Sequence, residues 1–122
     1  MLTQNILIQS IEDVYGYLYM GKQLEAEAKW EEAYKILKYI NECRLFEYNK
    51  EAYGLYEDYV VEKVKFLEHL AILNLHVTGD VRSSIRYIDE ALILLDGIES
   101  VAPYIDIKEV KNLKKQYVGL LF

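Results

Sequence analysis

Residues 59–97 read YVVEKVKFLEHLAILNLHVTGDVRSSIRYIDEALILLDG, with a Gly79-Asp80 pair near the middle. On both sides of this pair, apolar residues recur at steps of three and four, which is the spacing of one face of an α-helix. Gly79 can take the left-handed conformation that ends a helix, and Asp80 can cap the next one. The pattern predicts a helical hairpin whose first arm follows an N-cap at Asn49 and spans about residues 50–78. The predicted inward faces are Tyr53, Tyr56, Val60, Val64, Leu67, Ala71 and Leu75 in the first arm, and Val81, Ser84, Ile85, Ile88, Ala91, Leu92 and Leu95 in the second.

The helical spacing continues toward the N-terminus. Thr3 can cap a first helix that we expect to run to about Ala28, and a second helix is expected to begin at Lys29 or Trp30. Acidic residues in its first turn, Glu31 and Glu32, would suit the positive end of the helix dipole. The inward face of this second helix is predicted to contain Ala33, Leu37, Ile40 and Arg44.

The same spacing resumes toward the C-terminus. Gly97 ends the second arm of the hairpin, Pro103 marks a loop, and Asp106 can cap a last helix. The apolar face expected for this helix is Val110, Leu113, Tyr117, Leu120 and Leu121. No segment shows the alternating pattern of a strand, so we predict an all-α domain of about five antiparallel helices joined by short turns.

Composition agrees with one globular domain. The chain has 122 residues, 52% of them apolar, and a formal net charge of −6. No uninterrupted apolar run approaches the length of about 18 residues that a membrane span needs, so we expect no membrane segment. The first residues lack the basic region of a signal peptide, so we expect a cytoplasmic protein. The single cysteine, Cys43, cannot form an intrachain disulfide.

One segment resembles a known helical repeat. Tyr17-x-x-Met20-Gly21-x-x-Leu24, followed by Ala28-Lys-Trp-Glu-Glu-Ala33-x-x-x-Leu37-x-x-Ile40, is similar to a tetratricopeptide (TPR) repeat. Gly79-Asp80-Val81-x-x-Ser84-x-x-x-Ile88-x-x-Ala91-Leu92 resembles part of a second repeat. The helix before it departs from the pattern, with Glu68 and Ile72 where an aromatic residue and a glycine are usual.

The resemblance implies a particular architecture. It predicts a first hairpin over residues 1–48, a second over 49–97, and a C-terminal capping helix over 104–122, all within one domain of residues 1–122. Proteins of the TPR family act as scaffolds and adaptors, so the resemblance also implies protein binding. An unrelated helical bundle is the alternative, since any close helix crossing needs small residues such as Gly21, Ala33 and Ala91.

The residues that could carry chemistry do not form a catalytic pattern. His69 and His76 are seven positions apart on one predicted helix, about 10 Å along its axis, and helical metal ligands use spacings of three or four. Cys43 has no histidine nearby in the sequence, and the chain has no glycine-rich phosphate loop. We therefore expect no catalytic residues, metal site or cofactor, and no enzymatic activity.

Charge divides the chain into two unequal halves. Residues 1–62 carry 12 acids and 6 bases, whereas residues 63–122 carry 8 of each. Tyrosine is frequent at protein interfaces because it combines a large rigid ring with a hydroxyl group that tolerates water. We predict a partner-binding surface of tyrosines and carboxylates, made of Tyr15, Tyr19, Glu25, Glu27, Glu31, Glu32 and Tyr39. A possible basic patch consists of Arg82, Arg86, Lys108, Lys111 and Lys115.

These observations favour a non-enzymatic protein–protein interaction module, an adaptor or scaffold. The alternative is a small acidic inhibitor or regulator, virus-encoded or of the immunity type, that blocks a larger machine handling nucleic acid or acting in defence. The net charge of −6 opposes binding of nucleic acid, which is not an expected partner. Two repeats leave apolar ends exposed, and the acidic first hairpin is complementary in charge to the mildly basic last helix, so we also predict a homodimer.

Overall fold

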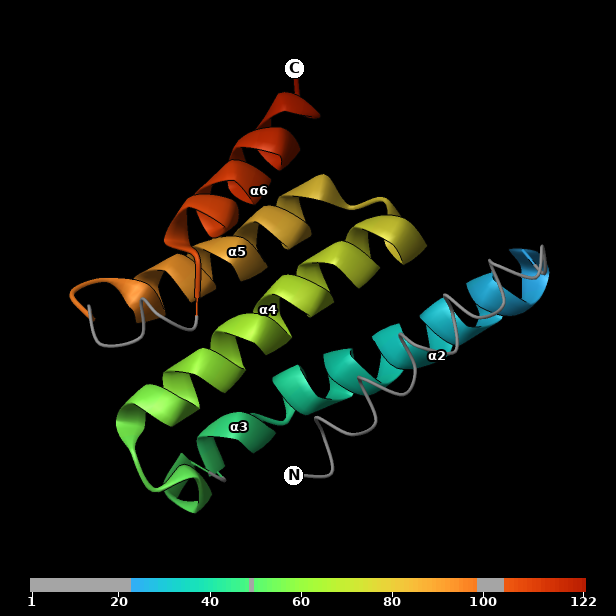
Figure 1. The fold of residues 1–122 in the computed structure, drawn as a ribbon. Coiled ribbons are helices and arrows are strands. Elements are labelled where there is room, and N and C mark those ends of the chain that lie inside the picture. Colours follow the sequence, from blue (N-terminus) through green and yellow to red (C-terminus); the bar gives the residue numbers. More distant parts are fainter. Residues whose placement is uncertain (1–22, 49, 99–104) are drawn as a thin grey trace.

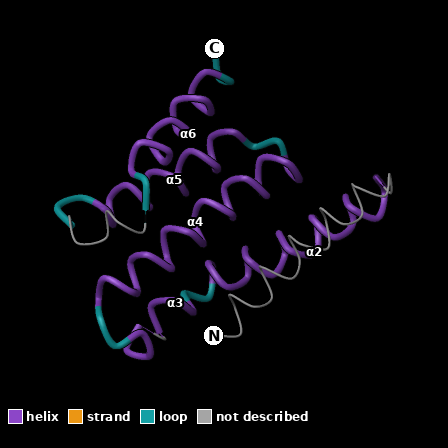
Figure 2. The backbone as a smooth tube through the Cα atoms, viewed as in Figure 1, coloured by secondary structure: helices purple, strands orange, loops and turns teal. Residues whose placement is uncertain are grey.

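The computed structural model describes residues 23–48, 50–98 and 105–122 (Figure 1). These residues form α2 (Gln23–Glu42), α3 (Leu45–Tyr48), the 3-10 helix η1 (Lys50–Tyr53), α4 (Tyr56–Thr78), α5 (Val81–Leu95) and α6 (Ile107–Gly119). Helices and connecting loops account for the whole of this part of the chain, without a strand (Figure 2). The prediction of an all-α protein is confirmed to this extent. No described helix combines the length and the apolar character that crossing a bilayer requires.

The long helices lie side by side in the order α2, α4, α5, α6 (Figure 1). Each runs antiparallel to its neighbour, and α3 and η1 lie at the end where α2 leads into α4. α4 therefore packs against α2 on one side and α5 on the other, while the main neighbour of α6 among the described long helices is α5.

The position of α4 explains the extent of its burial. Val60, Val64, Leu67 and Ala71 of the predicted face are fully buried, which confirms that part of the pattern. Phe66, Leu70 and Leu73 lie outside the predicted face and are buried as well. A helix between two neighbours buries two faces, so the single apolar stripe inferred from the sequence was too narrow. Tyr56, which we placed inside, is exposed at the start of the helix.

The turn between α4 and α5 forms as the sequence predicts. Gly79 has a φ of 71°, and its N–H donates to the Leu75 carbonyl over 3.0 Å. The Asp80 carboxylate then accepts a hydrogen bond of 3.2 Å from the Ser83 N–H at the start of α5. A left-handed glycine and a capping aspartate thus join the two helices within two residues.

The beginning of α2 differs from the prediction. We expected one helix to end near Ala28 and another to begin at Lys29 or Trp30, but α2 runs without a break from Gln23 to Glu42. Its sequence is rich in Ala, Glu and Lys, all strong helix formers, and contains neither glycine nor proline. Glu31 and Glu32 consequently lie in the middle of a helix rather than in a first turn.

Three other boundaries were predicted wrongly. Arg44 lies beyond the end of α2 with a φ of 54° and is exposed, so it is not part of the inward face. Residues 50–78 do not form one helix, because Gly54 adopts a φ of 75° between η1 and α4. Asp106 does cap α6, accepting from the Lys108 N–H over 2.9 Å. That helix ends at Gly119, however, and leaves Leu120 61% exposed rather than buried.

Several predictions fall outside the described residues. They are the first helix from Thr3, the Asn49 cap, the loop at Pro103, and the surface residues Tyr15 and Tyr19.

Candidate functional site

The outward face of α2 carries the described members of the predicted tyrosine and acidic surface. Ala33, Leu37 and Ile40 are buried, which turns the opposite side of the helix to solvent. That opposite side, which we call the α2 outer face, exposes Glu27, Glu31, Glu32 and Tyr39. Tyr39 is 63% exposed, a large fraction for an aromatic side chain. The Glu25 backbone is helical, but its side chain lies outside the described part.

Lysines make the α2 outer face less acidic than the sequence suggested. The Lys29 ammonium lies 3.5 Å from the Glu32 carboxylate, and Lys38 lies 3.9 Å from Glu42. These are exposed pairs, which contribute little to stability but offset charge locally. The surface is therefore mixed, with acids in the majority.

Tyr39 contacts Cys43, the residue that follows the end of α2. Hydrogen bonding to the Cys43 thiol, together with the charge that this thiol can carry, raises the pKa of Tyr39. A phenol is neutral at physiological pH even at its ordinary pKa of about 10, so Tyr39 presents an uncharged, partly apolar contact. The same two residues are joined through the backbone, where the Cys43 N–H donates to the Tyr39 carbonyl over 2.9 Å.

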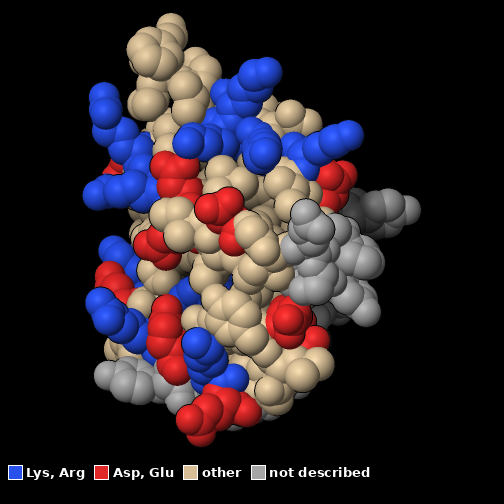
Figure 3. Space-filling model, turned by 90° about the vertical axis from the view of Figure 1, so that its left-hand side faces the viewer, with Lys and Arg blue, Asp and Glu red and all other residues tan. Residues whose placement is uncertain are grey.

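The predicted basic patch is divided between two helices. Lys108, Lys111 and Lys115 are all exposed on α6, whereas Arg82 and Arg86 lie on α5. Basic side chains gather at the height of α6 in a view from the end of the molecule, with acidic ones interspersed below (Figure 3). Toward its C-terminus α6 diverges from α5, the helix that carries the arginines (Figure 1).

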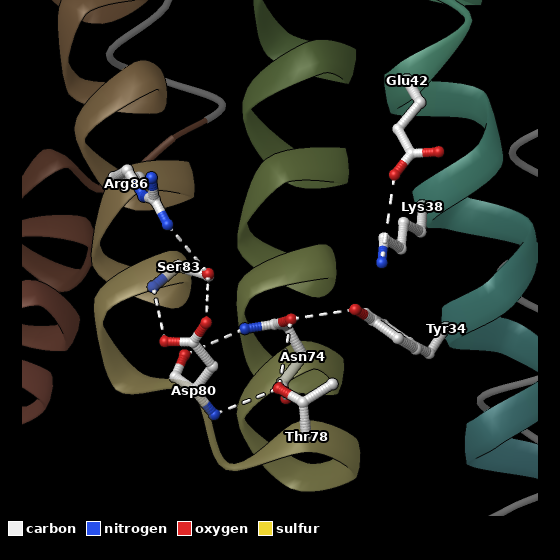
Figure 4. A network of polar contacts seen from close by, with 8 residues as sticks. All are labelled: Tyr34, Lys38, Glu42, Asn74, Thr78, Asp80, Ser83 and Arg86. Atoms are coloured by element: carbon white, nitrogen blue, oxygen red, sulfur yellow. Dashed lines mark hydrogen bonds and ion pairs between the residues drawn. The ribbon is translucent and has the colours of Figure 1, made fainter.

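A buried polar network joins α2, α4 and α5, and the sequence analysis missed it (Figure 4). Asn74 on α4 accepts from the Tyr34 hydroxyl of α2 at 3.1 Å and donates to the Ser84 hydroxyl of α5 at 2.9 Å. Its amide also donates to the Asp80 carbonyl at 3.0 Å, and Ser84 donates to the Ala71 carbonyl at 2.8 Å. Every member has a partner, so the network aligns three helices without leaving a buried polar atom unsatisfied.

A second polar contact joins α3 to α4. The buried Lys63 ammonium donates to Glu47 at 2.8 Å and lies 5.4 Å from the centre of the Phe46 ring. Burial raises the pKa of Glu47, but the hydrogen bond from Lys63, a backbone hydrogen bond and the charges of Lys63 and Arg44 together outweigh this effect, so the pKa is lowered overall. The Glu47 carboxylate therefore remains ionised at neutral pH, and its contact with Lys63 holds α3 against α4.

The histidines do not meet. His76 packs on Trp30 of α2 with ring centroids 4.1 Å apart, and burial lowers the pKa of His69 two turns earlier on α4. Among the described residues, no three or more His, Cys, Asp or Glu side chains come together in a group that could hold a metal ion.

Comparison with known proteins gave no match to a family model, to a curated protein or to a solved structure.

Proposed function

We propose that the chain is a non-enzymatic protein–protein interaction module, an adaptor or scaffold, that binds a partner protein through the α2 outer face. The observation that carries this proposal is the exposure of Glu31, Glu32 and, about two turns later, Tyr39 on a helix whose other side is packed against α4. A long helix held along one side presents its outward side chains in a fixed arrangement. Aromatic and charged groups placed in this way supply contact area and electrostatic steering, respectively.

The TPR-like arrangement of hairpins also remains our proposal. It is supported by small residues in the core, since Ala33, Ser84 and Ala91 are all buried. Small side chains at such positions allow two helix backbones to approach closely. The Gly79-Asp80 turn between α4 and α5 is consistent with one hairpin of this kind.

The test begins with identification of the partner by affinity purification from the native host and mass spectrometry. Association rates are then compared for the parent protein, Glu31→Lys and the matched control Glu90→Lys, which makes the same charge change on the exposed side of α5. We expect Glu31→Lys to slow association several-fold at low salt, because it replaces a negative charge on the docking surface by a positive one. The difference should shrink as salt rises.

The control should associate at the rate of the parent protein. Tyr39→Ser should mainly accelerate dissociation, because the ring contributes contact area rather than charge. Identical kinetics for the parent, Glu31→Lys and Tyr39→Ser would show that the partner binds elsewhere.

A further inference from the structure

A groove lies between the second half of α5 and the first half of α6, on the side of the molecule opposite α2. Its volume is about 990 Å³, and its apolar lining includes Leu92, Ile93, Ile98 and Ile107. Ile93 is 74% exposed. Such exposure is unusual for an isoleucine, because an apolar side chain stabilises the folded state only when it is removed from water. Lys111 and Lys114 form the α6 wall of this groove.

The groove continues along α6. A second hollow of about 380 Å³ shares Lys111 and Lys114 with it and extends to Lys115 and Val118. The α6 side of the combined groove therefore runs from Ile107 to Val118, about 18 Å of helix at 1.5 Å per residue. This length matches about three turns of a partner helix.

The charge along this groove is positive on the α6 side. Lys114 is paired with Asp89 at 2.7 Å, which neutralises one of the two carboxylates in the described lining. Lys108, Lys111 and Lys115 form no ion pair with any described residue and are exposed. Asp96 also lines the groove. The unpaired cations of the α6 lining, Lys111 and Lys115, thus outnumber the one unpaired carboxylate there, while Lys108 lies on α6 outside the lining.

We propose that this groove binds an acidic amphipathic helix of a partner protein. The apolar stripe of that helix would cover Ile93 and Ile107, and its carboxylates would lie beside Lys111 and Lys115. Helices recognised in grooves are held by apolar anchors at spacings of three, four and seven residues, which an aliphatic floor with a cationic rim accommodates. The proposal adds a second docking surface, with charge opposite to that of the α2 outer face.

Two other occupants fit the observations less well. Single-stranded nucleic acid stacks its bases on aromatic side chains, and the described lining of this groove is aliphatic. A second copy of the chain would have to supply an acidic helix, and its α2 outer face is interrupted by Lys35 and Lys38. The charge pattern therefore favours a more uniformly acidic segment.

The test uses labelled helical peptides of about 15 residues that carry leucines on one face. One peptide has glutamates on its other face, a second has lysines there, and a third has glutamates but serines in place of the leucines. Binding to the full chain is followed by fluorescence anisotropy at low and high salt. We expect the glutamate–leucine peptide to bind at least about tenfold more tightly than either of the others.

Matched variants locate the binding site. Ile93→Ser and Lys111→Glu should each weaken binding of the glutamate–leucine peptide by about tenfold. The controls Leu55→Ser, at a leucine 64% exposed near the start of α4, and Lys65→Glu, at an exposed lysine on α4, should leave it unchanged. Circular dichroism confirms that each variant remains helical.

Four results would overturn the proposal. They are equal binding of the lysine and glutamate peptides, equal losses in the groove and control variants, displacement of the bound peptide by a single-stranded oligonucleotide, and a dimer of the parent chain that Ile93→Ser dissolves. The last would assign the groove to a second copy. None of them bears on the α2 outer face, whose test uses other residues and another partner.

Discussion

Asn74 fixes how three helices meet. The side chain uses both its oxygen and its nitrogen, so it accepts from Tyr34 on one side and donates to Ser84 on the other. Apolar contacts tolerate small slides of one helix along another, but hydrogen bonds with defined donors and acceptors do not. This buried amide therefore defines the register of α2, α4 and α5.

Replacing Asn74 by alanine should destabilise the protein by about 1–3 kcal/mol, because buried groups that it satisfies lose their partner. Urea unfolding measures the change. Asn112→Ala makes the same substitution on the exposed side of α6 and should stay within about 0.5 kcal/mol of the parent. A similar loss in both variants would mean that the network contributes nothing to stability.

Glu68 provides a pH-dependent prediction. Burial, and after it the charge of Glu109, raises the pKa of Glu68 above the ordinary value of a glutamate. The folded state therefore holds this proton more tightly than the unfolded state, and stability is lost as pH rises from the unfolded pKa through the raised folded pKa.

Glu68→Gln should consequently raise the melting temperature at about pH 7, where the parent carries the disfavoured charge. At about pH 3 the parent carboxyl is protonated in both states, and the gain should vanish. Calorimetry at the two pH values checks this expectation, with Glu90→Gln on the exposed side of α5 as the matched control. A gain of equal size at both pH values would contradict the assigned cause.

The sequence predicted those helix boundaries that have a local cause and missed the others. The Gly79-Asp80 turn and the Asp106 cap were correct because their cause is local, namely a left-handed glycine and side chains that bond nearby N–H groups. Near Ala28 we predicted a break where α2 is continuous, and at Gly54 we predicted a continuous helix where the chain breaks. In both stretches the spacing of apolar residues is the same for a continuing helix and for a broken one. The second buried face of α4 arises from neighbours on two sides, which periodicity within one helix cannot reveal.

The candidate surfaces were predicted unevenly for similar reasons. Exposure of Glu27, Glu31, Glu32 and Tyr39 could be inferred, since they lie away from the apolar stripe of their own helix. The Lys29–Glu32 pair and the groove beside Ile93 could not, because they depend on side-chain conformations and on how α5 and α6 pack. The Asn74 network had one signal in the sequence, an amide among apolar residues.

Close packing of α5 on α4 leads to a prediction for the helix pair. Ala91 is fully buried and lies seven residues after Ser84, on the same side of α5, where Ser84 reaches the Ala71 carbonyl of α4. Ala91→Leu should overpack this contact and cost about 1–3 kcal/mol in the free energy of unfolding. Ala28→Leu, on the exposed side of α2, is the control. An unchanged denaturation midpoint for Ala91→Leu would place the close approach elsewhere.

The described long helices form a row with different charges at its two ends. α2 and α6 are the outer members among these helices, and acids predominate on the first whereas unpaired lysines predominate on the second. The two docking surfaces that we propose therefore lie on opposite sides of the α4–α5 pair.

The homodimer stays a prediction at this scale. Light scattering at micromolar concentration should give about twice the mass of one chain, 14.4 kDa, and a lower fraction of dimer at high salt. The mass should be the same for Ile93→Ser, because the groove between α5 and α6 is not the predicted dimer contact. A mass of one chain throughout would exclude self-association.

The central place of α4 determines how the native state opens. Among the described long helices, α2 and α6 each have one main neighbour and can detach from it, whereas α4 loses its cover only when the row comes apart. Backbone amides of residues 64–71 should therefore exchange their hydrogens with solvent at the rate of global unfolding, and those of α6 through smaller local openings. Hydrogen exchange followed by mass spectrometry checks this order, and equal rates for α4 and α6 would contradict it. A partner on an outer helix would then slow exchange in that helix alone, so the protection pattern would report which end of the molecule is occupied.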